Sequence, residues 1–415
     1  KTNTQQILLG VCLVSSINEN MNTKFLKFIY VFTTLFIIQS CKKSGCTDPE
    51  ALNYNIDAQK DDNSCLYEDY DKLSLLTNLA DNYIIPSLDA YKSKIVTLNI
   101  HVDSFITNPS ISNLTLIRTN WEDALLNWQD IGFLDFGPSE YILLRKQTNT
   151  FPIDTTELNN SITLADWNLE YTSSYDSKGL QALDYLLFKP GHTDNELITY
   201  FQNNENARNY LKALSEDLNQ NINYVSDQWI TYREDFINDF EVTTSNLSTN
   251  SQGSSISNII NALCLHYEFY VRRGKVGLPL GVFNGFSQLE LPELVECYYS
   301  GKSTQNLVRS INSLRKYVTG SSYLNNDNGL GLDDYMDFVN AEQNSQQLST
   351  VIDNQFLTIL EELNNINGPL SEEIINNKSQ ITQTYQELQQ LVPYMKVDMT
   401  SALGVLITYQ DNDGD

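Results

Sequence analysis

The chain has 415 residues, and its 26 Lys plus Arg against 52 Asp plus Glu give a formal net charge of −26 at pH 7. This charge argues against nucleic acid as a partner, because the phosphates would be repelled. It also argues against adhesion to anionic lipid by charge alone. A chain of this length suits two domains of ordinary size, at roughly 100–200 residues each.

The N-terminal region resembles an export signal. Residues 1–20 precede Met21 and are interpreted as a read-through or non-coding extension. Lys24 and Lys27 then form a short basic region. The apolar stretch that follows, residues 28–38, is too short and too near the start for a typical membrane-spanning helix. The pattern predicts a protein that is exported from the cytoplasm.

Ser40 directly precedes Cys41, as in a bacterial lipobox. This resemblance predicts that residues 21–40 are removed as a signal peptide and that Cys41 carries a lipid. An ordinary signal peptide followed by a chance cysteine is the alternative. The lipid would attach the protein to the membrane of the cell envelope, with the outer membrane as the expected location. Residues 1–40 hold three lysines and one glutamate, so the remainder of the chain carries −28.

Cysteine usage fits an exported protein, because an oxidising compartment permits disulfides. Cys46 and Cys65 enclose most of an Asp- and Asn-rich segment, residues 41–68, and a small disulfide-closed loop is expected there. Cys264 stands in an apolar helical stretch, where a cysteine usually serves as a core residue. Whether Cys264 pairs with Cys297 is left open by the sequence.

Apolar residues recur at helical spacing beyond residue 70. Steps of four and three run through residues 76–105, where Pro86 is expected to kink the helix. Further helices are predicted over residues 114–128, 178–188, 207–236, 256–273, 306–317, 333–363 (in one or two pieces) and 371–394. Ser371 is the predicted N-cap of the last helix. Residues 139–175 are predicted to form a long loop with short elements, and residues 275–286 a loop punctuated by glycine and proline.

The predicted fold is all-α, because no stretch indicates several alternating strands joined by hairpin turns. About four helices fall in each of two bundles. A polar stretch, residues 244–255, is the expected linker. It would separate a first bundle at residues 69–243, which contains the long irregular loop, from a second bundle at residues 256–415.

Five motifs in order resemble the imelysin family, whose exported bacterial members include insulin-cleaving metallopeptidases and iron-regulated protein A. The first is the stretch LADNYIIPSLDAY at residues 79–91. The other matched positions are Trp121, Trp128, Gly132, Phe136, Gly137 and Pro138 in one helical region, Gly179, Gln181 and Asp184 in KGLQALDYLLF, Lys275, Gly277 and Pro279 in KVGLPLG, and Asp413, Gly414 and Asp415 at the C-terminus. The resemblance implies two helical bundles with the family's site between them.

The motif positions also depart from the family pattern. Gln181 stands where the family's GxHxxE helix has His, and Asp184 stands where it has Glu. Leu125 takes the place of a family Arg, and Ile131-Gly132 that of a Ser-Glu pair. Gln offers zinc only a neutral oxygen, and Asp is one methylene shorter than Glu. No catalytic residue is therefore expected, although the family is classed as a metallopeptidase.

Gln181 and Asp184 lie three residues apart and should share one helix face. One interpretation is a buried polar pair, hydrogen-bonded to each other or to neighbouring helices. The other is a weak cation site, in which Asp184 and His192 of the following loop would be weak ligands. Iron and zinc are the possible cofactors that the family resemblance implies.

Three functions follow from the resemblance and its departures. The first is a binding role in the envelope, for iron, another metal species, or a partner protein of iron uptake. The second is a zinc-type metallopeptidase of the imelysin family. The third is a non-enzymatic interaction module that uses the Cys46–Cys65 segment and the acidic surface. The exchange of His and Glu for Gln181 and Asp184 favours the first.

Overall fold

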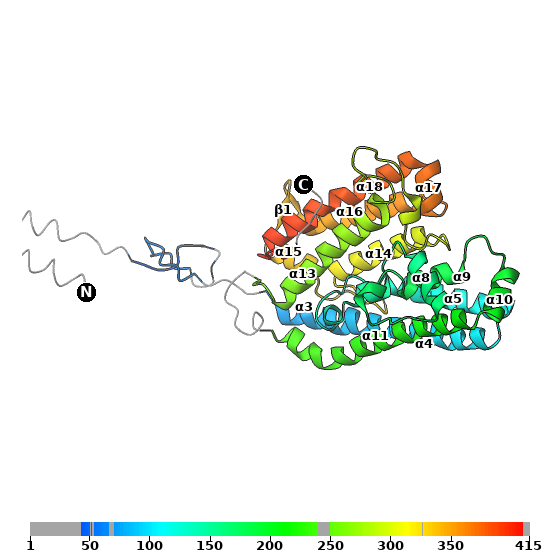
Figure 1. Cartoon of the computed structure of the whole chain (residues 1–415). Helices are drawn as coiled ribbons and strands as arrows, with labels where there is room; N and C mark the ends of the chain where they lie inside the picture. The colour runs from blue at the N-terminus through cyan, green and yellow to red at the C-terminus, as the bar shows by residue number, and fades with distance from the viewer. Residues whose placement is uncertain are drawn as a thin grey trace, which may run out of the picture. The chain divides into compact units, whose positions relative to one another are not determined.

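The computed structural model describes residues 43–49, 51, 54–65, 70–239, 250–325 and 327–409. The chain divides into two units, Lys1–Glu68 and Asp69–Asp415 (Figure 1). The predicted signal peptide, the predicted lipidation at Cys41, and Asp413, Gly414 and Asp415 all lie outside the described residues.

The first unit contains the predicted disulfide, since Cys46 and Cys65 are bonded to each other. Backbone hydrogen bonds join the two ends of the loop: the Gly45 N–H donates to the Lys60 carbonyl oxygen at 3.2 Å. The Asn55 N–H donates to the Cys46 carbonyl oxygen at 3.0 Å. The disulfide thus closes a loop that has its own hydrogen-bond pattern.

The second unit is built almost entirely from helices, as predicted. The first group is α3 (Lys72–Asn78), the π-helix η1 (Leu79–Ile84), α4 (Ile85–Thr107), α5 (Ile111–Trp128), α6 (Pro138–Tyr141), α7 (Leu144–Thr148), α8 (Thr155–Leu164), the 3-10 helix η2 (Thr172–Ser174), α9 (Gly179–Leu187), α10 (Asp194–Asn203) and α11 (Glu205–Ile237). Pro86 is the second residue of α4 and lies where the helical run changes from the π-helix η1 to α geometry. The predicted loop at residues 139–175 holds only short helices.

The second group follows the predicted linker. It comprises α13 (Ser255–Leu265), the π-helix η3 (His266–Gly277), the 3-10 helix η4 (Pro292–Leu294), α14 (Ser303–Val318), α15 (Leu332–Phe338), β1 (Glu342–Gln343), β2 (Gln346–Gln347), α16 (Leu348–Asn364), α17 (Leu370–Asn376), α18 (Lys378–Pro393), the π-helix η5 (Tyr394–Met399) and α19 (Thr400–Ala402). In the described part of the chain, β1 and β2 form the only sheet, an antiparallel pair.

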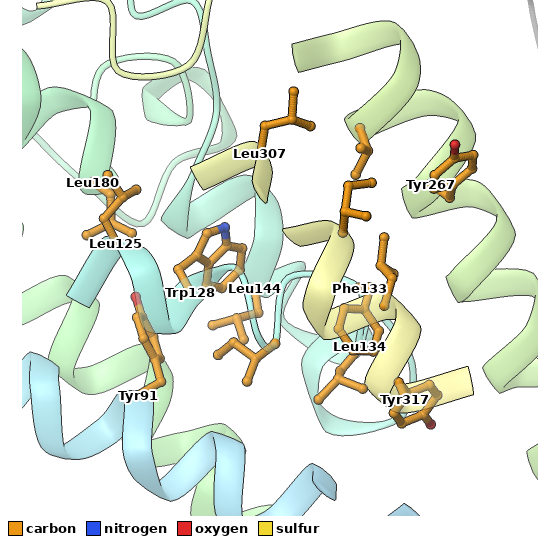
Figure 2. Packing of buried hydrophobic residues seen from close by; sticks show 14 of the residues in the cluster. Tyr91, Leu125, Trp128, Phe133, Leu134, Leu144, Leu180, Tyr267, Leu307 and Tyr317 are labelled. Atoms are coloured by element: carbon orange, nitrogen blue, oxygen red, sulfur yellow. The ribbon is translucent and has the colours of Figure 1, made fainter. Parts of the chain in front are cut away.

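Long helices form the centre of each group. In the first group α4 packs along both α5 and α11, and in the second α16 packs on α14 and α18 (Figure 1). The predicted apolar stripe of residues 76–105 is buried along its length. Apolar residues of both groups join in one core, since Trp128 of α5 lies in the same cluster as Tyr317 of α14 and Tyr267 of η3 (Figure 2). The site described below lies where the two groups meet.

The predicted boundary between helix 256–273 and loop 275–286 is wrong. The helix continues as η3 to Gly277, so Lys275 and Gly277 lie inside it. A π-helix bonds residue i to i+5, and the 3.6-residue spacing used for the prediction therefore does not hold. Gly277 fits there because a Cβ atom would lie 2.6 Å from the Phe283 ring and 2.8 Å from the Tyr385 ring.

In the second group the predicted helix 333–363 is in two pieces, one of the two forms expected, whereas the boundaries of the last predicted helix differ from the prediction. The hairpin of β1 and β2 divides the predicted helix 333–363, and its turn holds Asn344 and Ser345 at positive φ. Ser371 is not an N-cap, because it is the second residue of α17, whose N-cap residue is Pro369. The expected helix 371–394 is divided again at Asn377, where the backbone leaves the helical region.

The predicted linker 244–255 is described only from residue 250 onward. Asn250 is buried, and its Nδ2 donates to the Leu403 carbonyl oxygen at 2.6 Å. Ser255 already begins α13. This end of the linker is therefore fixed against the C-terminal part of the unit. No helix in the described ranges is long and apolar enough to cross a membrane.

Candidate functional site

The altered motif lies on α9, in which every residue is buried. Gly179 begins the helix at φ +77°, and a Cβ there would collide with the Thr148 carbonyl oxygen. Lys178 precedes it and is fully buried, with its Nζ 2.8 Å from Asp217 Oδ1 and 3.0 Å from Gln147 Oε1. Glycine is thus required because the start of α9 is pressed against the end of α7.

Trp121 joins α9 to α5. Its indole Nε1 donates to the Leu180 carbonyl oxygen at 2.9 Å, deep in the core. Leu125, at the place of the family Arg, is fully buried and apolar. Ile131 is also buried, and a Cβ on Gly132 would lie 3.3 Å from the Trp128 ring. These positions therefore pack the core and present no charged group to the site.

The other motif residues have packing roles as well. Phe136 stacks on Phe236 with ring centroids 5.9 Å apart. Gly137 has φ +54°, and a Cβ there would overlap the Tyr232 ring. Pro138 begins α6. Pro279 accepts a backbone hydrogen bond from the Leu291 N–H at 2.7 Å, which closes the loop after η3.

Gln181 and Asp184 both contact the segment 296–300 of the second group. Gln181 Oε1 accepts the Cys297 N–H at 2.9 Å, and its Nε2 lies 3.2 Å from Cys297 Sγ. Asp184 accepts two backbone N–H groups, from Tyr299 at 3.0 Å and Ser300 at 3.1 Å. The two side chains of α9 therefore hold this segment by its backbone. Of the two alternatives in the buried-pair interpretation, hydrogen bonds to neighbouring parts of the chain are the ones formed.

A buried polar network extends from Gln181. Its Nε2 donates to Asn149 Oδ1 at 2.8 Å, and Asn149 Nδ2 donates to Glu296 Oε1 at 2.7 Å. Glu296 forms an ion pair with Lys275, whose Nζ also donates to Gln129 Oε1 at 2.9 Å. Each of these five side chains is at least nine-tenths buried. The network joins α5, the loop after α7, α9, η3 and segment 296–300.

Burial sets the ionisation of two groups in the site. It raises the pKa of Asp184 to about 7, although the hydrogen bonds from Tyr299 and Ser300 oppose this shift. Burial likewise raises the pKa of the Cys297 thiol well above its usual value, and the Asp184 and Glu296 charges add to that effect. Cys297 is free, as is Cys264, so the two do not form a disulfide. The site therefore presents a thiol and a carboxyl group whose pKa is raised by burial.

A small cavity of about 240 Å³ adjoins these side chains. It is called the Gln181 pocket here, and its lining is Phe151, Pro152, Ile153, Gln181, Asp184, Glu293, Leu294, Val295, Tyr298 and Tyr299. The first and second groups of helices both contribute to it. The site thus combines a small cavity with the altered motif of α9.

The structure does not place His192 with Asp184. His192 is exposed, and its Nδ1 lies 3.2 Å from the Pro190 carbonyl oxygen. It lines a separate surface pocket beside Tyr200 of α10. The chain turns at Gly191, with φ +76°. After this turn His192 lies beside Tyr200 of α10. The predicted weak pair of metal ligands is therefore not formed.

Sequence reasoning found Gln181, Asp184 and Lys275 but missed the residues that connect them. Gln129, Asn149 and Glu296 belong to no motif and lie far apart in the chain. Cys297 was noted only as a cysteine without a known partner. The one sequence signal for these residues is that each is a polar residue beside an apolar segment. Many surface residues share this property, so it does not single them out.

Comparison with known proteins gives the same result as the motifs. The imelysin family matches residues 84–393. The fold is similar to the crystal structure of a protein designated an iron-regulated protein A precursor from Parabacteroides distasonis, with a TM-score of 0.66 at 15% identity, covering 82% of this chain and 97% of that one. It is also similar to an imelysin-like protein from Psychrobacter arcticum, with a TM-score of 0.60 at 14% identity, covering 81% and 97%.

At these identities the two structures show the fold alone. Comparison with curated proteins finds no match. The family match, in contrast, spans three-quarters of the sequence and includes α9, α5 and η3. The chain therefore belongs to the imelysin family.

Proposed function

We propose that this chain is a binding protein of the cell envelope that does not hydrolyse peptides. The lipobox-like Ser40-Cys41 supports an envelope location. The Gln181 pocket, between the two groups of helices, is the proposed binding site. One relative in fold is named as iron-regulated, which favours a role in iron uptake, through an iron species that keeps its own ligands or through a partner protein.

The proposal rests on one observation: the oxygens of the two motif side chains already accept hydrogen bonds from backbone N–H groups. Gln181 Oε1 accepts from Cys297, and the two oxygens of Asp184 accept from Tyr299 and Ser300. A peptidase needs a group that activates water, either a metal ion or a free base. In this arrangement the oxygens of both side chains already accept backbone N–H groups of segment 296–300, so neither side chain is free to bind a metal ion or to activate water.

The residues of the site do not fit a tightly bound zinc or iron ion. Gln181 offers one neutral oxygen, which is already an acceptor, and burial keeps Cys297 as a thiol. Across the described residues, no three His, Cys, Asp or Glu side chains come together as metal ligands would. Zinc and iron sites in proteins use several nitrogen, thiolate or carboxylate donors.

Calorimetry with Fe²⁺, Fe³⁺ and Zn²⁺ on the chain from residue 41 onward tests this proposal. We expect no tight binding of the aqua ions to the wild type. The double variant Gln181→His, Asp184→Glu restores the family's donor set and should gain affinity for Zn²⁺. Tight binding by the wild type that Asp184→Asn abolishes would contradict the absence of a metal site.

The metallopeptidase is the second candidate, because the chain belongs to a family classed with such enzymes. A peptide library incubated with the wild type, with and without a chelator, separates the two. Chelator-sensitive cleavage by the wild type would overturn the proposed function. If the Gln181→His, Asp184→Glu variant cleaves peptides and the wild type does not, the result would support a binding protein whose site has lost a peptidase-like activity.

A further inference from the structure

A second and larger cavity lies beside the Gln181 pocket and shares only Phe151 with it. It has a volume of about 420 Å³ and is called the Arg145 pocket here. Its lining is Arg145, Lys146, Asn149, Thr150, Phe151, Thr172, Ser173, Tyr175, Asp176, Phe269, Tyr270, Gly274 and Leu278. Cavities of about 300–1,000 Å³ with an apolar lining and a few placed polar groups are typical of sites for small molecules.

The walls of the Arg145 pocket are largely aromatic. Phe151 comes from the loop after α7, and Phe269 and Tyr270 come from η3 in the other group of helices. Gly274, also on η3, faces Phe151 across the pocket: a Cβ there would lie 3.9 Å from the Phe151 ring, which is ordinary van der Waals distance, and 3.2 Å from the Phe269 carbonyl oxygen. Such a lining suits a flat apolar body, because aromatic rings gain from stacking as well as from burial.

Arg145 is held firmly at this pocket. Its guanidinium lies 3.3 Å from the centre of the Tyr270 ring, and its Nη2 lies 2.6 Å from Asp135 Oδ2. Its Nε also bonds Asp135, at 3.2 Å. The remaining nitrogen, Nη1, has no protein acceptor in the described part of the chain. A fixed guanidinium with a spare N–H group is suited to bind an anionic oxygen.

The lining of the pocket is less acidic than the chain as a whole. Arg145 and Lys146 face one acid, Asp176, in the lining, whereas the chain as a whole carries −26. Lys146 is exposed and has no carboxylate partner within the described ranges. Asp135 neutralises much of the Arg145 charge, and Asp176 balances Lys146 within the lining, so the pocket is close to neutral in a strongly acidic chain.

We propose that the Arg145 pocket binds a small organic anion with a flat apolar body. The body lies between the Phe151 and Phe269 walls, and the anionic group contacts Arg145 Nη1 with Lys146 nearby. This site is separate from the altered family motif and does not depend on the proposed function. The ligand of the Arg145 pocket is thus an organic anion and not a bare metal ion.

Naphthalene-1-sulfonate is the test probe, with naphthalene-1-methanol as the uncharged analogue and 1-naphthylmethylammonium as the cationic one. Calorimetry on the chain from residue 41 onward should show the sulfonate binding at least about tenfold more tightly than the alcohol, with the ammonium weakest. Equal affinities for all three, a preference for the ammonium, or no binding of the sulfonate would each overturn the proposal.

Variants place the probe in the pocket. Lys146→Gln should weaken sulfonate binding about two- to fivefold and leave the alcohol unchanged, as expected for an exposed charge contact. Ser173→Trp, at the exposed rim, should weaken both by obstructing the mouth. Lys316→Gln is the matched control, because it removes the same charge at a different pocket on α14. Sulfonate binding unchanged in both Lys146→Gln and Ser173→Trp would place the probe elsewhere and contradict the assignment.

Arg145→Gln tests the fixed guanidinium, with circular dichroism to confirm that the variant is folded. A folded Arg145→Gln protein should lose at least about tenfold in sulfonate affinity. A folded variant with wild-type affinity would overturn the role of Arg145. If the variant does not fold, the Lys146→Gln and Ser173→Trp results decide the proposal.

Discussion

Gln181 and Cys297 bind each other at two points, although 116 residues separate them in the chain. The Cys297 N–H donates to Gln181 Oε1 at 2.9 Å, and Gln181 Nε2 lies 3.2 Å from Cys297 Sγ. The place of the family's histidine thus serves here to join α9 to segment 296–300. A hydrogen-bonded amide does this well, because it is both donor and acceptor and carries no charge into the core.

The first prediction concerns this contact. Gln181→Ala leaves the Cys297 N–H and the side-chain Oδ1 of Asn149 without their partner, and it also removes packing volume. An unsatisfied buried group costs about 1–3 kcal/mol, so we expect the free energy of unfolding to fall by about 2–4 kcal/mol. Urea unfolding at pH 7 measures this change. Gln181→Met keeps the volume without the hydrogen bonds and is the control for packing; a loss below about 0.5 kcal/mol for Gln181→Ala would contradict the contact.

The second prediction concerns pH. Burial raises the pKa of folded Asp184 to about 7, above the usual value of 3.8 in the unfolded chain. Between these values the folded state binds more protons than the unfolded state, so stability falls as pH rises from about 4 to about 7. The slope from one such group approaches about 1.4 kcal/mol per pH unit.

Asp184→Asn should remove that slope, as measured by urea unfolding at several pH values. Asp333 has a pKa raised to about 7 by burial and by the charge of Asp334, and it gives a slope of the same sign. The Asp184→Asn variant therefore keeps a residual slope that comes from Asp333. The substitution Asp333→Asn should remove that part. An unchanged pH profile in Asp184→Asn would show that the carboxyl group is ionised throughout this range.

The third prediction concerns the buried ion pair of Lys275 and Glu296. Removing one partner leaves a buried charge without compensation, which typically costs about 3–5 kcal/mol. We expect such losses for Lys275→Met and for Glu296→Gln, where Gln keeps an acceptor for Asn149 and Gln129. The double variant should lose far less than the sum of the two. A double-mutant cycle by chemical unfolding measures the coupling, and strict additivity would rule out an interacting pair.

The fourth prediction compares two glycines with nearly the same φ angle. Gly179 has φ +77° and Gly191 has φ +76°, but only a Cβ at Gly179 meets other atoms, those of the Thr148 and Gln147 backbone. Ala at Gly191 should cost about 1–2 kcal/mol, the usual cost of this conformation for an L-residue. Ala at Gly179 should cost at least about 2 kcal/mol more, because α9 must move away from α7. Equal losses in thermal unfolding would mean that the close approach is absent.

The helices of this protein could be predicted from its sequence wherever a regular spacing of apolar residues marked a buried face. The stripe of residues 76–105 and that of α5 belong to this class, and the Cys46–Cys65 pair followed from an export signal and a short loop. The family could be recognised because five motifs occur in the order that is typical of it. These features are local, so residues near one another in the chain are enough to determine them.

Only the tertiary structure decided what the altered motif does. Gln181 and Asp184 contact backbone groups of Cys297, Tyr299 and Ser300, and backbone N–H groups leave no mark in a sequence. The π-helix η3 placed Lys275 in the core against Glu296 because its spacing departs from 3.6 residues. The partners of a buried polar group are set by how distant segments pack, and for that reason a motif alone could name the residues of the site but not their contacts.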